Sequence, residues 1–142
     1  PNTNDHGVIR SDFPGGWPDD EKNAFTGKGI SEKKKEAQSF MKKLLNWRKN
    51  EEVIHNGELT HFLPRNECYV YFRHNEEKTI MVALNKNAEE TAKINTKRLQ
   101  ECLKGKSSGI NVLTEERVED LDELKINPKS AVIIELDSSN QQ

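Results

Sequence analysis

Hydrophobic residues between positions 30 and 50 recur at steps of three and four, and this spacing predicts one amphipathic helix. The apolar stripe consists of Ala37, Phe40, Met41, Leu44, Leu45 and Trp47. Glu32 in the first turn and Arg48 and Lys49 in the last turn suit the helix dipole. A stripe of this kind needs a partner, which lies either in the flanking segments or outside this chain.

After the helix, apolar and polar residues alternate in short runs separated by turn residues, which predicts antiparallel strands. The clearest hairpin is 68–85, because the polar stretch 75–78 separates two runs of β-forming residues. We expect strands at 59–63, 68–74, 79–85, 91–95, 110–113, 124–126 and 131–136, with a helical turn or a strand edge at 97–104. Strands at this short, regular spacing are typical of a β-sandwich.

The segment before the helix, residues 1–29, contains three of the five prolines and five of the eight glycines. Such spacing breaks both helical and strand periods, so the segment is predicted to be a loop. Its apolar residues, among them Phe13, Trp17 and Phe25, favour a structured loop over a disordered tail.

The composition sets limits on the class of protein. A chain of 142 residues with 32% hydrophobic residues and a net charge of −2 is one modest domain with no general attraction to nucleic acid. No run is long and apolar enough to span a membrane, and no signal peptide is visible. Because the chain begins with Pro1 and not Met, we expect a piece of a longer protein. Cys68 and Cys102 are predicted to be buried or free thiols, with a disulfide as the alternative.

Three stretches together resemble the α-amylase family of glycoside hydrolases (family 13), specifically its neopullulanase and cyclomaltodextrinase-like members. They are NDHGVIRSDFPGGW (4–17) with NAFT (23–26), LLNWRKN (44–50) with VIHNG (53–57), and YVYFR (69–73) with IMVALNK (80–86). The first is similar to the loop after the eighth barrel strand, the second to the last barrel helix and its exit, and the third to the first hairpin of the C-terminal domain. Together they cover most of the chain in the order that the family has.

The resemblance implies an α+β fragment, in which the last loop and helix of a (β/α)8 barrel precede an antiparallel β-sandwich, the amylase C-terminal domain. Residues 1–50 would be the remnant of the catalytic barrel, residues 51–137 the sandwich, and residues 138–142 a polar tail. The implied function is the C-terminal region of an α-glucan-degrading hydrolase, which stabilises a catalytic barrel missing from this chain. The implied location is compatible with the periplasm or the extracellular space, and the sequence alone leaves it unknown.

A retaining glycosidase needs two carboxyl groups about 5–5.5 Å apart. The family motifs that carry them do not occur here, so we assign no catalytic residue and expect this chain alone to be inactive. The resemblance implies that Asp5 and Arg10 bind glucose hydroxyls in the parent enzyme, with Asp12 as the other candidate carboxylate because the spacing is one residue longer than in close relatives. Carboxylate and guanidinium groups suit sugar hydroxyls, although all three could instead satisfy turn backbone. Trp17 could stack on a sugar ring, but we favour a hydrophobic plug that holds the loop down.

Two rival functions come from other classes. A stand-alone carbohydrate-binding module would use Tyr69, Tyr71 and Phe72 for stacking, of which the two tyrosines share one strand face and Phe72 points the other way. A protein-interaction domain would cover the helix stripe, for example with a second copy of the chain. No cofactor is expected, and the four histidines, His6, His55, His61 and His74, have no metal-ligand spacing.

Overall fold

The computed structural model describes residues 12–138. The chain divides between Lys43 and Leu44 into two compact units. The predicted boundary at residue 50 lies further along, because the last turn of the long helix packs with the sheets of the second unit. The assignment of residues 1–50 to a barrel remnant stays a prediction.

The helix α2 (Glu32–Lys49) confirms the predicted amphipathic helix. None of its residues is buried. Of the apolar stripe, Leu44 and Trp47 are half-buried, whereas Phe40, Met41 and Leu45 are each about half exposed (47%, 48% and 51%). Within the described part of the chain, the stripe therefore finds a partner only at its C-terminal end.

The described residues before α2 form successive turns, as expected for a structured loop. The Asn23 side-chain oxygen accepts hydrogen bonds from the backbone N–H groups of Phe25 (2.9 Å) and Thr26 (3.0 Å). The rings of Phe13 and Phe25 contact each other with their centroids 5.5 Å apart. Polar side chains that mimic backbone partners hold such turns without a core of their own.

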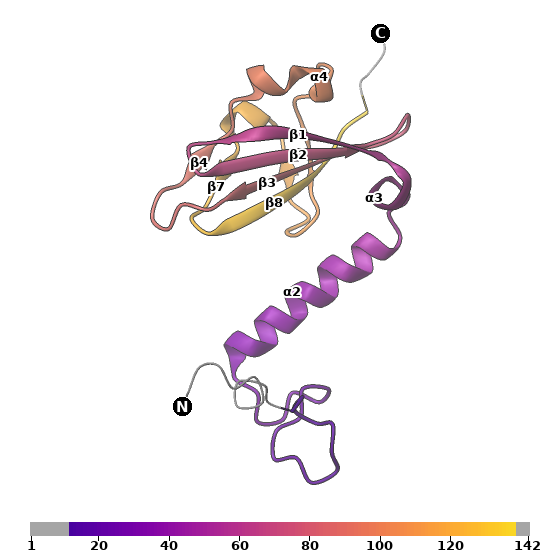
Figure 1. Cartoon of the computed structure of the whole chain (residues 1–142), viewed down its shortest axis with the longest axis vertical. Coiled ribbons are helices and arrows are strands. Elements are labelled where there is room, and N and C mark those ends of the chain that lie inside the picture. The colour runs from indigo at the N-terminus through magenta and orange to yellow at the C-terminus, as the bar shows by residue number, and fades with distance from the viewer. Residues whose placement is uncertain (1–11, 139–142) are drawn as a thin grey trace. The chain divides into compact units, whose positions relative to one another are not determined.

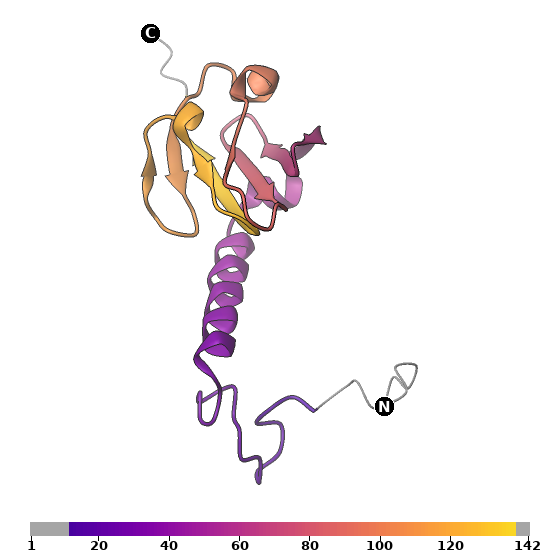
Figure 2. The ribbon, with the colours of Figure 1, turned by 90° about the vertical axis from the view of Figure 1, so that its left-hand side faces the viewer.

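The second unit is an antiparallel β-sandwich, and it confirms the predicted class (Figure 1). A six-stranded sheet has the order β1 (Glu58–Arg65), β2 (Cys68–His74), β3 (Thr79–Asn85), β8 (Ser130–Leu136), β5 (Gly109–Asn111) and β6 (Arg117–Val118). A two-stranded sheet pairs β4 (Ala92–Lys93) with β7 (Lys125–Ile126). Figure 2 shows the yellow β8 beside the orange pair β5 and β6. The short strand β6 was not expected from the sequence, since two residues carry no readable period.

Four short helical segments complete this unit: α3 (Glu52–Asn56), the 3-10 helix η1 (Thr96–Leu99), α4 (Gln100–Leu103) and the 3-10 helix η2 (Leu121–Glu123). Residues 97–104 are thus mostly helical, which is the first of the two alternatives predicted for them. One face of the six-stranded sheet packs with η1, α4 and the two-stranded sheet to form the main core. Phe72, Met81 and Ile134 are fully buried there, from three adjacent strands.

Asn85, at the end of β3, connects the two sheets through the core. Its side chain is 2% exposed. The amide nitrogen donates to the backbone carbonyls of Glu90 (2.8 Å), Ile126 (3.0 Å) and Asn127 (3.2 Å), and its oxygen accepts from the Asn87 N–H (3.0 Å). One buried side chain therefore satisfies the Ile126 carbonyl of the two-stranded sheet and backbone groups of the turns beside it.

The helix α3 is fastened to the sheet by its own carbonyl groups. The Arg73 guanidinium donates to the backbone oxygens of Ile54 (2.7 Å) and Val53 (3.4 Å). Both carbonyls belong to α3, and the Val53 oxygen also accepts the Gly57 backbone N–H at 3.1 Å. A Cβ atom at Gly57 would lie only 2.4 Å from the Val53 oxygen, so glycine is required where α3 turns into β1.

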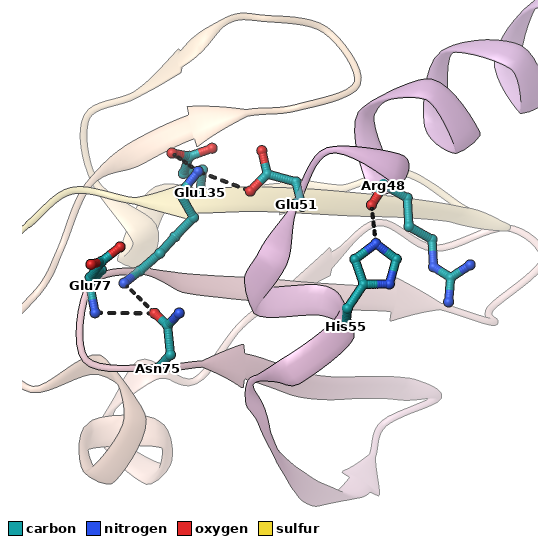
Figure 3. Close-up of polar contacts among 7 residues, drawn as sticks. Arg48, Glu51, His55, Asn75, Glu77 and Glu135 are labelled. Carbon is teal, nitrogen blue, oxygen red and sulfur yellow. Dashed lines mark hydrogen bonds and ion pairs between the residues drawn. The ribbon is translucent and has the colours of Figure 1, made fainter.

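A second polar contact fixes the start of α3. The Lys78 ammonium group lies 2.9 Å from a carboxylate oxygen of Glu51 and 2.9 Å from one of Glu135, on β8 (Figure 3). Burial lowers the pKa of Lys78, but the hydrogen bonds that its ammonium group donates to Glu135 and Glu51 outweigh burial and leave the pKa above its ordinary value. Together with Arg73, this ion pair holds α3 in one place on the sheet.

Replacing Asn85 by leucine should lower the free energy of unfolding by about 3 kcal/mol, because it removes the donor to the buried Ile126 carbonyl and to the partly buried carbonyls of Glu90 and Asn127. Urea unfolding of the chain followed by circular dichroism measures this loss. As a control, Asn95→Ala removes an exposed amide that makes no cap hydrogen bond, and should change stability by less than about 0.5 kcal/mol. Equal losses in both variants would contradict the role given to Asn85.

Lys78→Met should lower the free energy of unfolding by about 1 kcal/mol at pH 7, the upper end for partly exposed ion pairs. The pKa of Lys78 is raised in the folded state, so its contribution is complete below the unfolded pKa of about 10.4 and is lost as the pH rises beyond it. Unfolding curves of both proteins from pH 7 to 11 should therefore converge at the alkaline end. A difference that persists unchanged at pH 11 would show that Lys78 acts only through packing.

Candidate functional site

The six-stranded sheet has a second face, opposite the main core, which we call the outer face. Along β2, Val70 and Phe72 point into the core, so alternation puts Tyr69, Tyr71 and Arg73 on the outer face. The strand register adds their neighbours. The outer face thus comprises Leu59, His61, Leu63, Tyr69, Tyr71, Arg73, Ile80, Val82, Leu84, Ala131, Ile133 and Glu135.

One half of the outer face is already covered. A second hydrophobic cluster forms there around Ile80, Val82 and Ile133, with Val53 of α3 placed over them. Val53 is 2% exposed. Leu44 and Trp47, from the last turns of α2, pack against the same cluster. The end of α2 and the helix α3 therefore shield the centre of the sheet from water.

The other half of the outer face is open to solvent. We define the open half as Leu59, His61, Leu63, Tyr69 and Leu84, of which Tyr69 is half-buried and the other four are exposed. Leu59 is 56% exposed, Leu63 76% and Leu84 37%. No formally charged side chain lies among these residues, although 32% of the chain is charged. An uncharged, largely apolar surface of this kind is typical of an interface.

Sequence reasoning predicted the strand 59–63 but not this exposure. The signal was present, because the run Leu59-Thr60-His61-Phe62-Leu63 has large apolar residues on both of its faces. Such a strand is usually covered on both sides. The alternation of residues along the strand could not show which of its two faces is covered by other parts of this chain.

The aromatic residues proposed for sugar stacking lie along β2. The rings of Tyr69 and Tyr71 have centroids 5.6 Å apart and planes inclined by 36°, and His61 meets Tyr69 edge-on at 6.3 Å. Burial raises the pKa of Tyr71, as does Tyr69, while Arg73 opposes the rise. Phe72 is fully buried in the core and cannot contact a ligand. The remaining two tyrosines form a tilted pair, not a flat platform.

The candidates in the N-terminal loop are less well defined. Asp5 and Arg10 lie outside the described residues, and their role in substrate binding stays a prediction. Asp12 is exposed. Trp17 is 68% exposed, so the plug interpretation is wrong for this structure. The turn is held instead by Asp20, whose carboxylate accepts the Trp17 N–H at 3.1 Å.

Chemistry of other kinds has little support in residues 12–138. No group of three or more His, Cys, Asp or Glu side chains in this range could hold a metal ion, and no helix in it is long and apolar enough to cross a membrane. Cys68 and Cys102 are free thiols, as predicted. Burial raises the pKa of both, which disfavours the reactive thiolate.

A cavity of about 330 Å³ opens on the core side of the sheet, near the turn between β1 and β2. Several donors on its wall are already engaged. Asn85 binds backbone carbonyls, Lys93 pairs with Glu123 at 3.1 Å, and Arg98 donates to the Leu63 carbonyl at 2.6 Å. Three of the donors on the cavity wall are therefore already used within the fold, and we take the outer face as the candidate site.

Comparison with known proteins agrees with this geometry. A family model described as the Cyclo-malto-dextrinase C-terminal domain matches residues 59–135, more than half of the chain. Among solved structures, an AmyP variant in complex with maltotriose has a TM-score of 0.64 at 12% identity, covering 78% of this chain and 22% of that chain. An α-amylase from Geobacillus thermoleovorans complexed with acarbose has a TM-score of 0.51 at 16% identity, with 66% of this chain and 21% of that chain covered. Trehalose-6-phosphate hydrolase from Bacillus licheniformis has a TM-score of 0.51 at 21% identity, covering 68% of this chain and 18% of that chain.

At these identities the structural likeness shows the fold, and the chain spans about a fifth of the length of the structures it matches. The family model matches the sequence of the sandwich itself, so it shows the family as well as the fold. This chain belongs to the family of Cyclo-malto-dextrinase C-terminal domains, the non-catalytic β-sandwich region of α-amylase-family enzymes.

Proposed function

We propose that this chain is part of a longer α-glucan-degrading hydrolase, in which it stabilises the catalytic barrel and supplies no catalytic carboxylate. The observation that carries the proposal is the family match over residues 59–135. Two of the structural neighbours are complexes with maltotriose and acarbose, which supports an α-glucan as the substrate class of the whole enzyme.

The exposed stripe of α2 supports the assignment of residues 1–50 to a barrel remnant. Phe40, Met41 and Leu45 remain about half exposed along its stripe. A helix on the outside of a (β/α)8 barrel packs a stripe of this kind against the strand ring. In the whole enzyme, the loop before α2 would follow the eighth strand, and Asp5 and Arg10 would bind glucose hydroxyls of the substrate.

A second candidate function, a stand-alone carbohydrate-binding module, is favoured by one observation. Tyr69 and Tyr71 lie on the same sheet face with their ring centroids 5.6 Å apart. Against it, Tyr71 packs on the covered half of the outer face, and the two ring planes are inclined by 36°. Sugar-stacking aromatics need free, flat faces, so the first function is the better supported.

The isolated 142-residue chain should hydrolyse neither starch nor cyclodextrin, whereas the enzyme encoded by the complete gene should hydrolyse at least one of them. The physical reason is that the paired carboxylates needed for retaining hydrolysis are assigned to the part outside this chain. Release of reducing sugar by equal molar amounts of both proteins provides the comparison. Turnover by the isolated chain would overturn the proposal.

Titration of the isolated chain with maltoheptaose should give no heat of binding that corresponds to a Kd of about 1 mM or tighter. Isothermal titration calorimetry on the unmodified 142-residue chain and on its Tyr71→Ala variant decides between the two functions. Binding that Tyr71→Ala abolishes, with the circular dichroism spectrum unchanged, would favour the carbohydrate-binding module instead.

A further inference from the structure

We propose that the cavity on the core side of the six-stranded sheet binds a small organic oxyanion, that is, a phosphate ester or a carboxylate. Its volume of about 330 Å³ lies within the range of small-molecule sites. The turn between β1 and β2 lies beside β4, and both line the cavity together with the turn after β3 and with η1 (Figure 1). All of these segments belong to the second unit. The site therefore does not depend on the role proposed for the sandwich in a longer enzyme.

The floor of the cavity is apolar. Val70, Ile94 and Leu99 line it, and all three are buried side chains of the main core. The half-buried Cys68 lies on the same wall. Ligand sites commonly combine an apolar lining of this kind with a few polar groups that fix the orientation of the ligand. The floor thus provides a surface for the body of a small molecule, and the polar groups lie at its rim.

The geometry of the β1–β2 hairpin brings Arg65 to this cavity. Arg65 pairs with Cys68 across the two strands, so both side chains lie on the core side of the sheet. Between them, Asn66 and Glu67 have φ angles of 50° and 59°, as in the type I′ turn that matches the twist of a hairpin. The Glu67 carbonyl accepts the backbone N–H of Lys86 at 2.9 Å. The turn therefore fixes the backbone from which Arg65 reaches the cavity, as preorganised binding requires.

Arg98, from η1, brings a second guanidinium group to the same cavity. One of its nitrogens donates to the Leu63 carbonyl at 2.6 Å, and its central carbon lies 5.8 Å from the centroid of the Phe62 ring. These contacts hold the side chain in place and use one of the three guanidinium nitrogens. Burial raises the pKa of Cys68 and Arg98 opposes the rise, so the charge of Arg98 acts at the cavity wall.

Neither Arg65 nor Arg98 has a carboxylate partner within residues 12–138. The two arginines elsewhere in the six-stranded sheet are both engaged. Arg117 binds the Asp137 carboxylate at 2.6 Å, and Arg73 donates to backbone carbonyls of α3. The arginines without a carboxylate are therefore the two that line the cavity.

The charge of the lining selects the ligand. Among the described residues that line the cavity, the cations are Arg65, Lys93 and Arg98, and the one carboxylate is Glu90. Lys93 is paired with Glu123, which does not line the cavity. Two guanidinium groups thus remain against one carboxylate, in a chain with a net charge of −2. Because guanidinium groups bind carboxylates and phosphates through two parallel hydrogen bonds, an oxyanion is the ligand that fits.

The test is a calorimetric titration of the 142-residue chain with three probes that share a sugar ring: glucose 6-phosphate, glucuronate and glucose. At an ionic strength of about 0.15 M, we expect a Kd of about 1 mM or tighter for at least one of the two anions and no binding of glucose. Binding of glucose 6-phosphate alone would identify the ligand class as a phosphate ester, and binding of glucuronate alone would identify a carboxylate. Either result supports the proposal.

Two variants place the bound anion. Arg65→Met should weaken its binding about tenfold, because the variant removes a charged hydrogen-bond donor. Lys97→Met is the matched control, since it removes the same charge from an exposed residue of η1 that does not line the cavity. This control should change the Kd by less than about twofold. Circular dichroism spectra of both variants should match that of the unmodified chain.

The thiol of Cys68 gives an independent readout of occupancy. Its alkylation by iodoacetamide is followed by mass spectrometry, with the buried Cys102 as an internal reference. The anion at about ten times its Kd should slow the alkylation of Cys68 about tenfold, because only the empty cavity exposes the sulfur atom.

Four results would overturn the proposal. The first is a Kd weaker than about 1 mM for both anions. The second is equal weakening by Arg65→Met and Lys97→Met, which would show general attraction to a positive surface. The third is binding of glucose as tight as that of the anions, which would make the cavity a neutral sugar site. The fourth is an unchanged rate of Cys68 alkylation at saturation. None of these measurements involves hydrolysis, so they leave the test of the proposed function separate.

Discussion

The structure depends on a sheet that is apolar on both faces and must be covered twice. One cover comes from the chain itself, through the two-stranded sheet, η1 and α4, and it forms the main core around Phe72 and Ile134. The other cover is partial, since α2 and α3 reach only the centre of the outer face. Leu59 and Leu63 therefore remain exposed to water, although strands with apolar residues on both faces are usually covered on both sides.

Polar contacts fix the positions of the two-stranded sheet and of α3 on the six-stranded sheet. Asn85 ties the two-stranded sheet to β3 by hydrogen bonds to backbone carbonyls, and Arg73 does the same for α3 on the opposite face. Hydrophobic burial is not directional, so it favours contact without fixing geometry. Directional bonds to backbone groups supply that geometry, and here they act once on each side of the sheet.

This arrangement is consistent with the supporting role that we propose for the sandwich. The most reactive side chains in the second unit are either engaged in structural pairs, as Lys78 and Glu135 are, or buried with a raised pKa, as Cys102 is. What remains available is apolar surface beside a fixed helix. In the proposed function, catalysis belongs to another part of the polypeptide and the sandwich has a supporting role.

The sequence by itself determined the helix, the hairpin 68–85 and the sandwich class, because each rests on a local period that neighbouring residues dictate. It also determined the family, through motifs carried by short stretches. Only the tertiary structure decided which leucines face water, because Leu59 and Phe62 look alike in sequence and differ in what packs against them. The role of Asn85 and the exposure of Trp17 were decided in the same way, since each depends on partners that the local pattern does not contain.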